Sequence, residues 1–144
     1  MAKLFQRVGG VLVLDAEGLL KLARGDAVAR SYFEDARGAK GAIVAVASTL
    51  TEVLRGGPRD APVYRILSKM TVVPIDSDTA RAAGELLGRT GLSGHRCALD
   101  SLVATVALAQ SRPVVLLTSD PNDIERLTEE PERPRKERIT VIRI

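Results

Sequence analysis

The chain has 144 residues, which fits one domain over residues 1–144, and 45% of them are apolar, enough for a hydrophobic core. Its single cysteine and single histidine exclude an intramolecular disulfide and a structural zinc site, and the 3% aromatic content leaves few side chains on which nucleic-acid bases could stack. The net charge of +3 is compatible with a polyanionic partner, whose binding would be mainly electrostatic.

The first part of the chain predicts two strands, each followed by helix. Residues 11–14 are consecutively apolar, as in a strand covered on both faces, and three leucines shortly after them suggest a short helix. Helical spacing from about 26 to 37 predicts a second helix, and 42–47 read as a second buried strand. Ser48 or Thr49 can cap the helix that follows, which ends at two glycines.

The middle of the chain predicts a third strand between helices. A helix over 63–70 leads into a strand at 71–75, and Asp76 or Ser77 can cap the next helix, which Gly91 closes. A further, mostly buried helix is indicated by apolar residues at helical spacing, namely Leu99, Leu102, Val103, Val106 and Ala109.

The last part predicts two more strands. Residues 114–117 form a fourth strand, and Pro121 suits the first turn of a short helix. The charged stretch 129–138 is expected to be a solvated loop, and 139–144 the final strand. Strands alternate with helices and lie too far apart for hairpins. The order therefore predicts an α/β fold, a three-layer α/β/α sandwich around a central parallel sheet.

Five acidic residues fall near the place where such a sheet binds ligands, outside the carboxyl ends of its strands. Asp15 immediately follows the first strand, and Glu52 lies early in the helix after the second. Asp120 follows the fourth strand, with Asp123 one turn further, and Asp100 begins the apolar helix before that strand. Each acid alone could be a turn residue or a helix cap. Independent caps, however, have no reason to converge on one edge, so the set predicts a cluster.

A cluster of carboxylates is costly, because like charges repel and raise each other's pKa. A divalent cation removes that cost, and hard oxygen ligands suit Mg²⁺ or Mn²⁺, which keep waters for chemistry. Such a water can become a nucleophile, and the metal can stabilise charge on a phosphodiester. The sequence therefore predicts a Mg²⁺ or Mn²⁺ site.

Four motifs resemble the PIN-domain family, and in particular the VapC-type toxin ribonucleases of toxin–antitoxin pairs. They are Val13-Leu14-Asp15-Ala16, Leu50-Thr51-Glu52-Val53-Leu54-Arg55-Gly56, Leu99-Asp100-Ser101-Leu102-Val103-Ala104 and Leu117-Thr118-Ser119-Asp120-Pro121-Asn122-Asp123-Ile124. The resemblance runs from about Val11 to the C-terminus and implies a PIN-like fold with metal-dependent endoribonuclease activity. It implies that the metal is held by Asp15, Glu52, Asp100 and the pair Asp120 and Asp123, with support from the Thr118 hydroxyl.

The same resemblance implies an RNA substrate, a homodimer and a small antitoxin whose tail covers the site. A cytoplasmic location without a membrane span is expected, since the apolar run at 11–14 is too short for a signal peptide or a span. Two departures from the family pattern stand out. Ser119 follows Thr118 where many relatives carry a basic residue, and Glu17 lies close to Asp15.

Two other hypotheses stay open. One is a PIN-like scaffold that binds RNA or a protein partner without catalysis, although a scaffold has no use for a costly carboxylate cluster. The other is a phosphoacceptor receiver domain, which expects paired acids after the first strand, where this chain has Asp15 and Ala16. His95 is expected to be exposed in a loop, and Cys97 to be a small buried residue.

Basic side chains that could guide an RNA backbone are spread over the chain. A charged run of this kind is usually a solvated face, so they permit RNA binding without predicting it. They are Arg55, Arg59, Arg89, Arg96, Arg112, Arg133, Arg135, Lys136 and Arg138.

Overall fold

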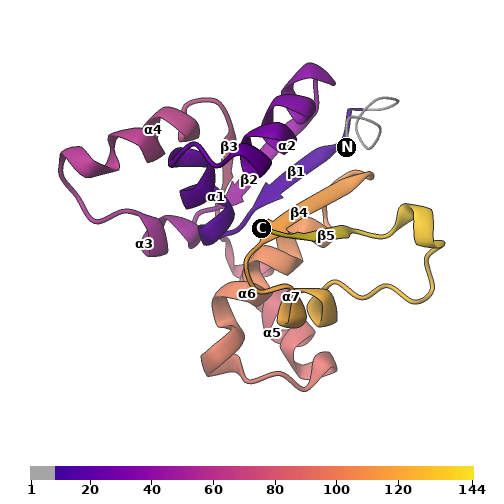
Figure 1. Ribbon diagram of the computed structural model, residues 1–144. Coiled ribbons are helices and arrows are strands. Elements are labelled where there is room, and N and C mark those ends of the chain that lie inside the picture. The colour runs from indigo at the N-terminus through magenta and orange to yellow at the C-terminus, as the bar shows by residue number, and fades with distance from the viewer. Residues whose placement is uncertain (1–8) are drawn as a thin grey trace.

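The computed structural model describes residues 9–144, which form a five-stranded parallel sheet between helices (Figure 1). The strands are β1 (Val11–Leu14), β2 (Ala42–Val46), β3 (Thr71–Val73), β4 (Val114–Thr118) and β5 (Thr140–Arg143). Their order in the sheet is β3-β2-β1-β4-β5, and every pair of neighbours is parallel. The predicted α/β/α architecture is confirmed. A receiver domain is excluded, because its doubly wound sheet has the order 2-1-3-4-5.

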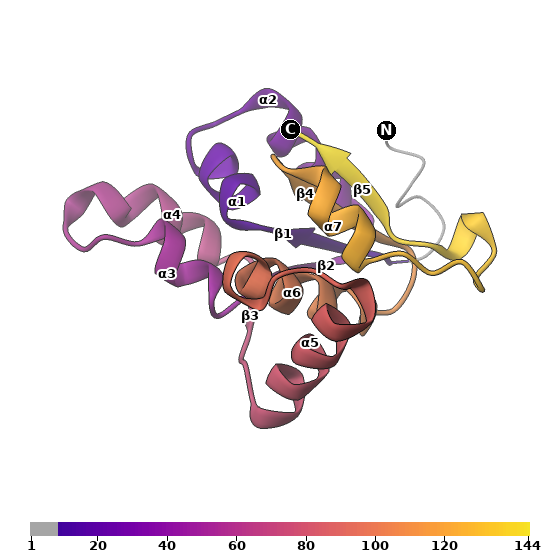
Figure 2. The same ribbon diagram turned by 90° about the horizontal axis from the view of Figure 1, so that it is seen from below.

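Helices cover both faces of the sheet, α1 and α2 on one face and α6 on the other, with α5 packed on the outer side of α6 (Figure 2). The helices are α1 (Ala16–Ala23), α2 (Ala27–Gly38), α3 (Thr49–Val53), α4 (Ala61–Leu67), α5 (Ser77–Thr90), α6 (Gly94–Leu108) and α7 (Pro121–Leu127). Short 3₁₀ helices lie at η2 (Pro58–Asp60) and η3 (Arg135–Glu137). Helix α4 packs on α1, and α7 packs on α6. Over residues 9–144 we find no helix with the length and apolarity needed to cross a bilayer.

The consecutive apolar residues of β1 are buried because they serve two cores at once. Leu12 and Leu14 pack with side chains of α1 and α2, whereas Val11 and Val13 pack with α6. Successive strand side chains point to opposite faces, so a central strand covered on both faces must be apolar throughout. Burying each leucine stabilises the fold by roughly 1.5–3 kcal/mol.

The sheet has a topological switch point between β1 and β4. From β1 the chain builds outward through β2 to β3, and it then returns through α5 and α6 to place β4 on the other side of β1. The helices after β1 and β4 therefore leave in different directions, and a crevice opens between the carboxyl ends of these two strands. Open α/β sheets bind their ligands at such a crevice.

Several predictions about helix starts are wrong in detail. Helix α6 begins at Gly94 with the Ser93 side chain as its N-cap, so Asp100 lies inside the helix, and His95 is exposed in its first turn and not in a loop. Leu99 is 37% exposed, since the sheet-facing side of α6 lies at Val103, Val106 and Ala107. At α3, neither predicted cap forms, and the hydroxyls of Ser48 and Thr49 are buried without a hydrogen-bond partner.

The stretch 129–138 is not simply a solvated loop. It contains η3, and the Glu130 side chain is buried against Arg112, which comes from the loop before β4. The two side chains form a two-pronged ion pair, which neutralises both charges. The charged composition of the segment therefore gave no sign that a buried ion pair attaches it to the rest of the fold. The third strand is also shorter than expected and ends at Val73.

Candidate metal centre

Asp15 lies where β1 passes into α1, beside the switch point. Its backbone N–H donates to the carbonyl oxygen of Leu117 at 3.3 Å, and its Oδ1 accepts from the N–H of Gly18 at 2.8 Å. A Cβ at position 18 would stand 3.1 Å from the Leu117 carbonyl oxygen, so glycine lets α1 begin this close to β4. Asp15 is therefore the N-cap of α1. Capping uses Oδ1, and the second carboxylate oxygen remains for the crevice.

Glu52 and Asp100 approach Asp15 from two different helices. Glu52 is carried by α3, the short helix after β2, and Asp100 is a half-buried residue of α6, on the opposite side of the sheet. After burial, the charges of Asp100 and Asp15 raise the pKa of Glu52, and the charge of Asp15 raises that of Asp100, so the three carboxylates lie near one another. Glu52 and Asp100, which follow Asp15 by 37 and 85 positions, approach it because β2 pairs with β1 and α6 packs against the same strand.

Thr118 ends β4 and is buried, and Asp120 follows it as the exposed residue before α7. The Thr118 hydroxyl accepts from the backbone N–H of Asp120 at 3.1 Å. Its own proton has two acceptors within reach, the Asp120 carbonyl oxygen at 3.3 Å and the Asp15 carboxylate, of which the charged one binds more strongly. Thr118 therefore links the carboxyl ends of β1 and β4. The Asp120 side chain makes no capping hydrogen bond to α7.

These side chains border one cleft of about 250 Å³, here called the acidic cleft. It is lined by Asp15, Ala16, Glu17, Glu52, Asp100, Val103, Thr118, Ser119 and Asp120. Five of the nine are acidic, and among residues 9–144 none of the lining side chains is basic. Glu17, which the sequence placed near Asp15, lines the cleft as well.

Asp123 does not line the acidic cleft. It stands one turn further along α7, where its Oδ2 accepts from the Sγ of Cys97 at 3.6 Å. One ligand atom each of Cys97, Asp100 and Asp123 lie within 4.8 Å of one another, so Asp100 stands between Asp123 and the cleft. The sequence predicted Cys97 as a buried residue but missed this contact. No sequence signal pointed to it, because Cys97 and Asp123 are 26 residues apart and meet only where α7 packs on α6.

The pKa values record the crowding of negative charge. Burial raises the pKa of Asp15, and the neighbouring Glu17 adds to this, while hydrogen bonds from Thr118 and Gly18 partly oppose it. For Asp100, burial followed by repulsion from Asp15, Asp123 and Asp120 raises the pKa. Burial, Asp100 and Asp15 likewise raise the pKa of Glu52. The fold thus holds these carboxylates together although burial and mutual repulsion disfavour their ionised forms, and a bound cation would remove that repulsion.

The residues present fit a divalent cation of the hard class. All potential ligands that line the acidic cleft are carboxylate or hydroxyl oxygens, the donors that Mg²⁺ and Mn²⁺ prefer. The one sulfur nearby, on Cys97, is buried and bonded to Asp123, outside the cleft lining. The donor set therefore favours Mg²⁺ or Mn²⁺ over a soft metal.

The raised pKa values predict how a cation should stabilise the protein as pH changes. A carboxylate whose pKa is higher in the folded than in the unfolded protein adds to the free energy of unfolding at a pH below its unfolded pKa. This contribution is lost as the pH rises through its folded-state pKa. The unfolded pKa values are 3.8 for Asp15 and Asp100 and 4.5 for Glu52. A cation binds the ionised cluster, so the gain in melting temperature on adding Mg²⁺ should grow between about pH 4 and pH 7. Each kcal/mol should add about 2–8 °C.

Thermal unfolding with Mg²⁺ or with EDTA, repeated across this pH range, measures the gain. Glu130 has the opposite trend, because hydrogen bonding to Arg112 lowers its pKa, but it contributes equally with and without metal and cancels in the difference. The gain should shrink in an Asp100→Asn variant. A Mg²⁺ effect that is independent of pH, or equal in the variant, would count against a metal site at these residues.

Comparison with known proteins places the fold among solved structures. No protein-family model and no curated protein matches this chain. The chain is similar to one from the crystal structure of VapBC2 from Rickettsia felis bound to a DNA fragment from their promoter, with a TM-score of 0.66 and 15% identity. The match covers 92% of this chain and 98% of that chain. At this identity, the likeness shows a shared fold.

Proposed function

We propose that this protein is a metal-dependent endoribonuclease that acts as the toxin of a toxin–antitoxin pair. One observation carries the proposal: Asp15, Glu52, Asp100 and Asp120 come from four different parts of the fold and border one cleft that lacks a basic side chain among the described residues. A non-catalytic scaffold would gain nothing from this repulsion. The fold shared with a VapBC2 chain and the PIN-like motifs of the sequence also support the proposed ribonuclease activity.

The proposed roles follow from the geometry. Asp15, Glu52, Asp100 and Asp120 would hold Mg²⁺ or Mn²⁺, and the bound cation would supply an activated water and stabilise charge on the phosphodiester. Thr118 would position Asp15, because its buried hydroxyl lies between the ends of β1 and β4. Asp123, whose carboxylate lies within 4.8 Å of that of Asp100, would add its negative charge to the attraction for the cation. Glu52 lies at the exposed rim of the cleft, where its carboxylate would be in reach of a water held by the cation.

The ribonuclease is tested by incubating the purified protein, free of any antitoxin, with total RNA in Mg²⁺ or Mn²⁺. We expect cleavage that disappears with EDTA and in an Asp15→Asn variant, since both remove the means of holding the cation. Gel electrophoresis of the RNA measures the result. RNA that remains intact although metal is bound would reject the ribonuclease and favour the scaffold hypothesis.

The toxin role needs a cellular experiment, because it rests on family likeness and not on the cleft. Expression of the wild-type chain should arrest bacterial growth, and expression of Asp15→Asn should not. A cognate antitoxin would then be sought as a protein that binds the chain and restores growth, and size-exclusion chromatography would test the expected homodimer. Unimpeded growth at expression levels that yield active ribonuclease in lysates would contradict the toxin role.

A further inference from the structure

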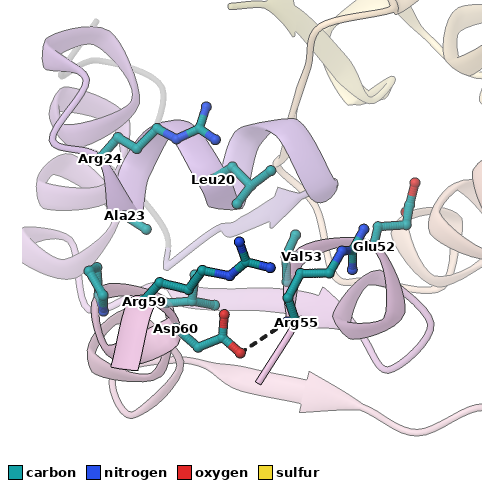
Figure 3. A pocket seen from close by; sticks show the side chains of 10 residues that line it. Leu20, Ala23, Arg24, Glu52, Val53, Arg55, Arg59 and Asp60 are labelled. Atoms are coloured by element: carbon teal, nitrogen blue, oxygen red, sulfur yellow. Dashed lines mark hydrogen bonds between the residues drawn. The ribbon is translucent and has the colours of Figure 1, made fainter. Parts of the chain in front are cut away.

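A second cavity, of about 540 Å³, lies next to the acidic cleft (Figure 3). We call it the arginine pocket, after Arg24, Arg55 and Arg59, which line it together with apolar side chains that include Leu20 and Val53. Its volume is within the range of about 300–1,000 Å³ that is typical of ligand sites. Glu52 lines both cavities, so the arginine pocket and the acidic cleft share a wall.

The arginines come from separate elements and line one pocket. Arg24 is the C-cap residue that follows α1, while Arg59 is in η2, and Figure 3 shows Leu20, Ala23 and Arg24 on the α1 wall with Arg55 and Arg59 on the opposite wall. Within residues 9–144, none of the three forms an ion pair. In the described part of the fold, the pocket therefore has three guanidinium groups outside any ion pair and two lining carboxylates, those of Glu52 and Asp60, which leaves an excess of one positive charge.

Asp60, a carboxylate inside the pocket, bonds backbone groups and not the guanidinium groups of the pocket arginines. Asp60 is buried, and its Oδ2 accepts from the backbone N–H groups of Arg55 at 3.0 Å and Gly56 at 2.6 Å. This carboxylate holds the turn after α3 and is not paired with a guanidinium. The guanidinium of Arg55 in turn donates to the carbonyl oxygens of Thr51 and Leu54, which fixes it near Glu52. These hydrogen bonds thus hold the pocket wall in place, while the guanidinium groups of its arginines stay out of ion pairs with the described residues.

The pocket combines cationic walls with an apolar surface formed by Leu20, Val53 and Val63. This combination suits a ligand with a flat, weakly polar body and an anionic group. A nucleotide has both, and unpaired RNA bases can stack on guanidinium planes where aromatic side chains are lacking. An inorganic anion alone would leave the apolar surface unused.

We infer that the arginine pocket binds one unstacked nucleotide of single-stranded RNA, adjacent to the phosphodiester in the acidic cleft. Because Glu52 lines both cavities, a strand with a phosphate in the cleft passes directly into the pocket. The positive charge that the acidic cleft lacks would come from Arg24, Arg55 and Arg59. This inference rests on the proposed ribonuclease function and assigns the part of the substrate that the cleft does not hold.

Binding without cleavage tests the pocket directly. A fluorescein-labelled single-stranded oligoribonucleotide of mixed sequence is titrated with protein in EDTA, and anisotropy gives the Kd for wild type, Arg24→Ala and Arg59→Ala. We expect each substitution to weaken binding about tenfold and to reduce the slope of log Kd against log salt by about 0.7 for each phosphate that the variant no longer neutralises. A nucleoside monophosphate should compete better than inorganic phosphate, because only the nucleotide uses the apolar surface.

The matched control is Arg81→Ala, which removes one positive charge from the exposed start of α5, where Arg81 makes only a surface contact with Asp78. This variant should bind as wild type does. If Arg24→Ala and Arg59→Ala keep wild-type affinity and salt slope while the wild-type protein cleaves RNA, the inference is wrong and the proposed function stands. If binding falls as expected but wild type does not cleave with metal, the pocket stands and the proposed function fails. Normal RNA binding combined with loss of a protein partner would also overturn the inference.

Discussion

Replacing Asp100 by Asn is expected to reduce RNA cleavage by about a thousandfold while leaving the metal-free protein at least as stable as wild type. Activity should fall because a carboxylate at the centre of the acid group would be removed. Stability should not fall, since Asn keeps the shape of Asp and removes a charge that burial, Asp15, Asp123 and Asp120 all disfavour, as the raised pKa of Asp100 shows. Single-turnover cleavage and thermal unfolding in EDTA measure the two effects.

The opposite signs of these effects make the prediction specific. A residue that serves packing alone would lose activity and stability together. Asp78→Asn is the matched control, because its side chain is 91% exposed on α5 and makes only a surface contact with Arg81. It should change neither quantity. Near-normal cleavage by Asp100→Asn, or a marked fall in its metal-free melting temperature, would contradict the assigned role.

The largest loss of stability is expected for Glu130→Ala, at about 3–5 kcal/mol. The Glu130 carboxylate bonds both terminal nitrogens of Arg112, at 2.6 and 2.9 Å, and the two side chains are only 9% and 13% exposed. Arg112 also donates to the Leu108 carbonyl oxygen at the end of α6. Truncation would leave this guanidinium buried without a counter-charge. Urea unfolding of the variant and of wild type measures the difference.

Glu130→Gln provides the control for charge, since it keeps the shape and part of the hydrogen bonding and should lose less stability than the alanine variant. Glu130 does not line the acidic cleft, so cleavage at low temperature should persist in both variants. The pKa of Glu130 is lowered by hydrogen bonding to Arg112, so its stabilising contribution should fade as pH falls through the folded-state pKa. Equal urea midpoints for wild type and Glu130→Ala would show that the ion pair does not anchor the segment.

The fold was predictable because its strands carry a strong local signal. The central strands β1 and β4 are buried on both faces and therefore read as uninterrupted apolar runs. The start of α6 was not predictable from apolar spacing, because its first turn is exposed and polar and the buried residues begin only at Cys97. Glu130 was misplaced for a related reason. In sequence, a charged residue of a buried ion pair looks like a residue of a solvated surface, and nothing local shows that Glu130 pairs with Arg112, 18 residues away.

The candidate site was partly predictable, because some of its acids come shortly after strands of the parallel sheet. Asp15 and Asp120 directly follow strands, so the parallel topology alone brings them to one edge. Asp123 could not be separated from Asp120 by sequence, because only the direction of α7 places one at the cleft and the other beside Cys97. The arginine pocket had no sequence signal at all. Arg24 and Arg59 line one pocket only because α4 and the turn before it pack against α1.

The central claim is that the carboxylates of the acidic cleft form a site for a divalent cation, and titration calorimetry with Mn²⁺ tests it most directly. Metal-free wild-type protein and its Asp15→Asn, Asp100→Asn and Asp78→Asn variants are titrated under identical conditions. We predict saturable Mn²⁺ binding by wild type and Asp78→Asn, and strongly weakened binding by the two cleft variants. Wild-type protein that binds no Mn²⁺, or cleft variants that bind it as tightly as wild type, would contradict the claim.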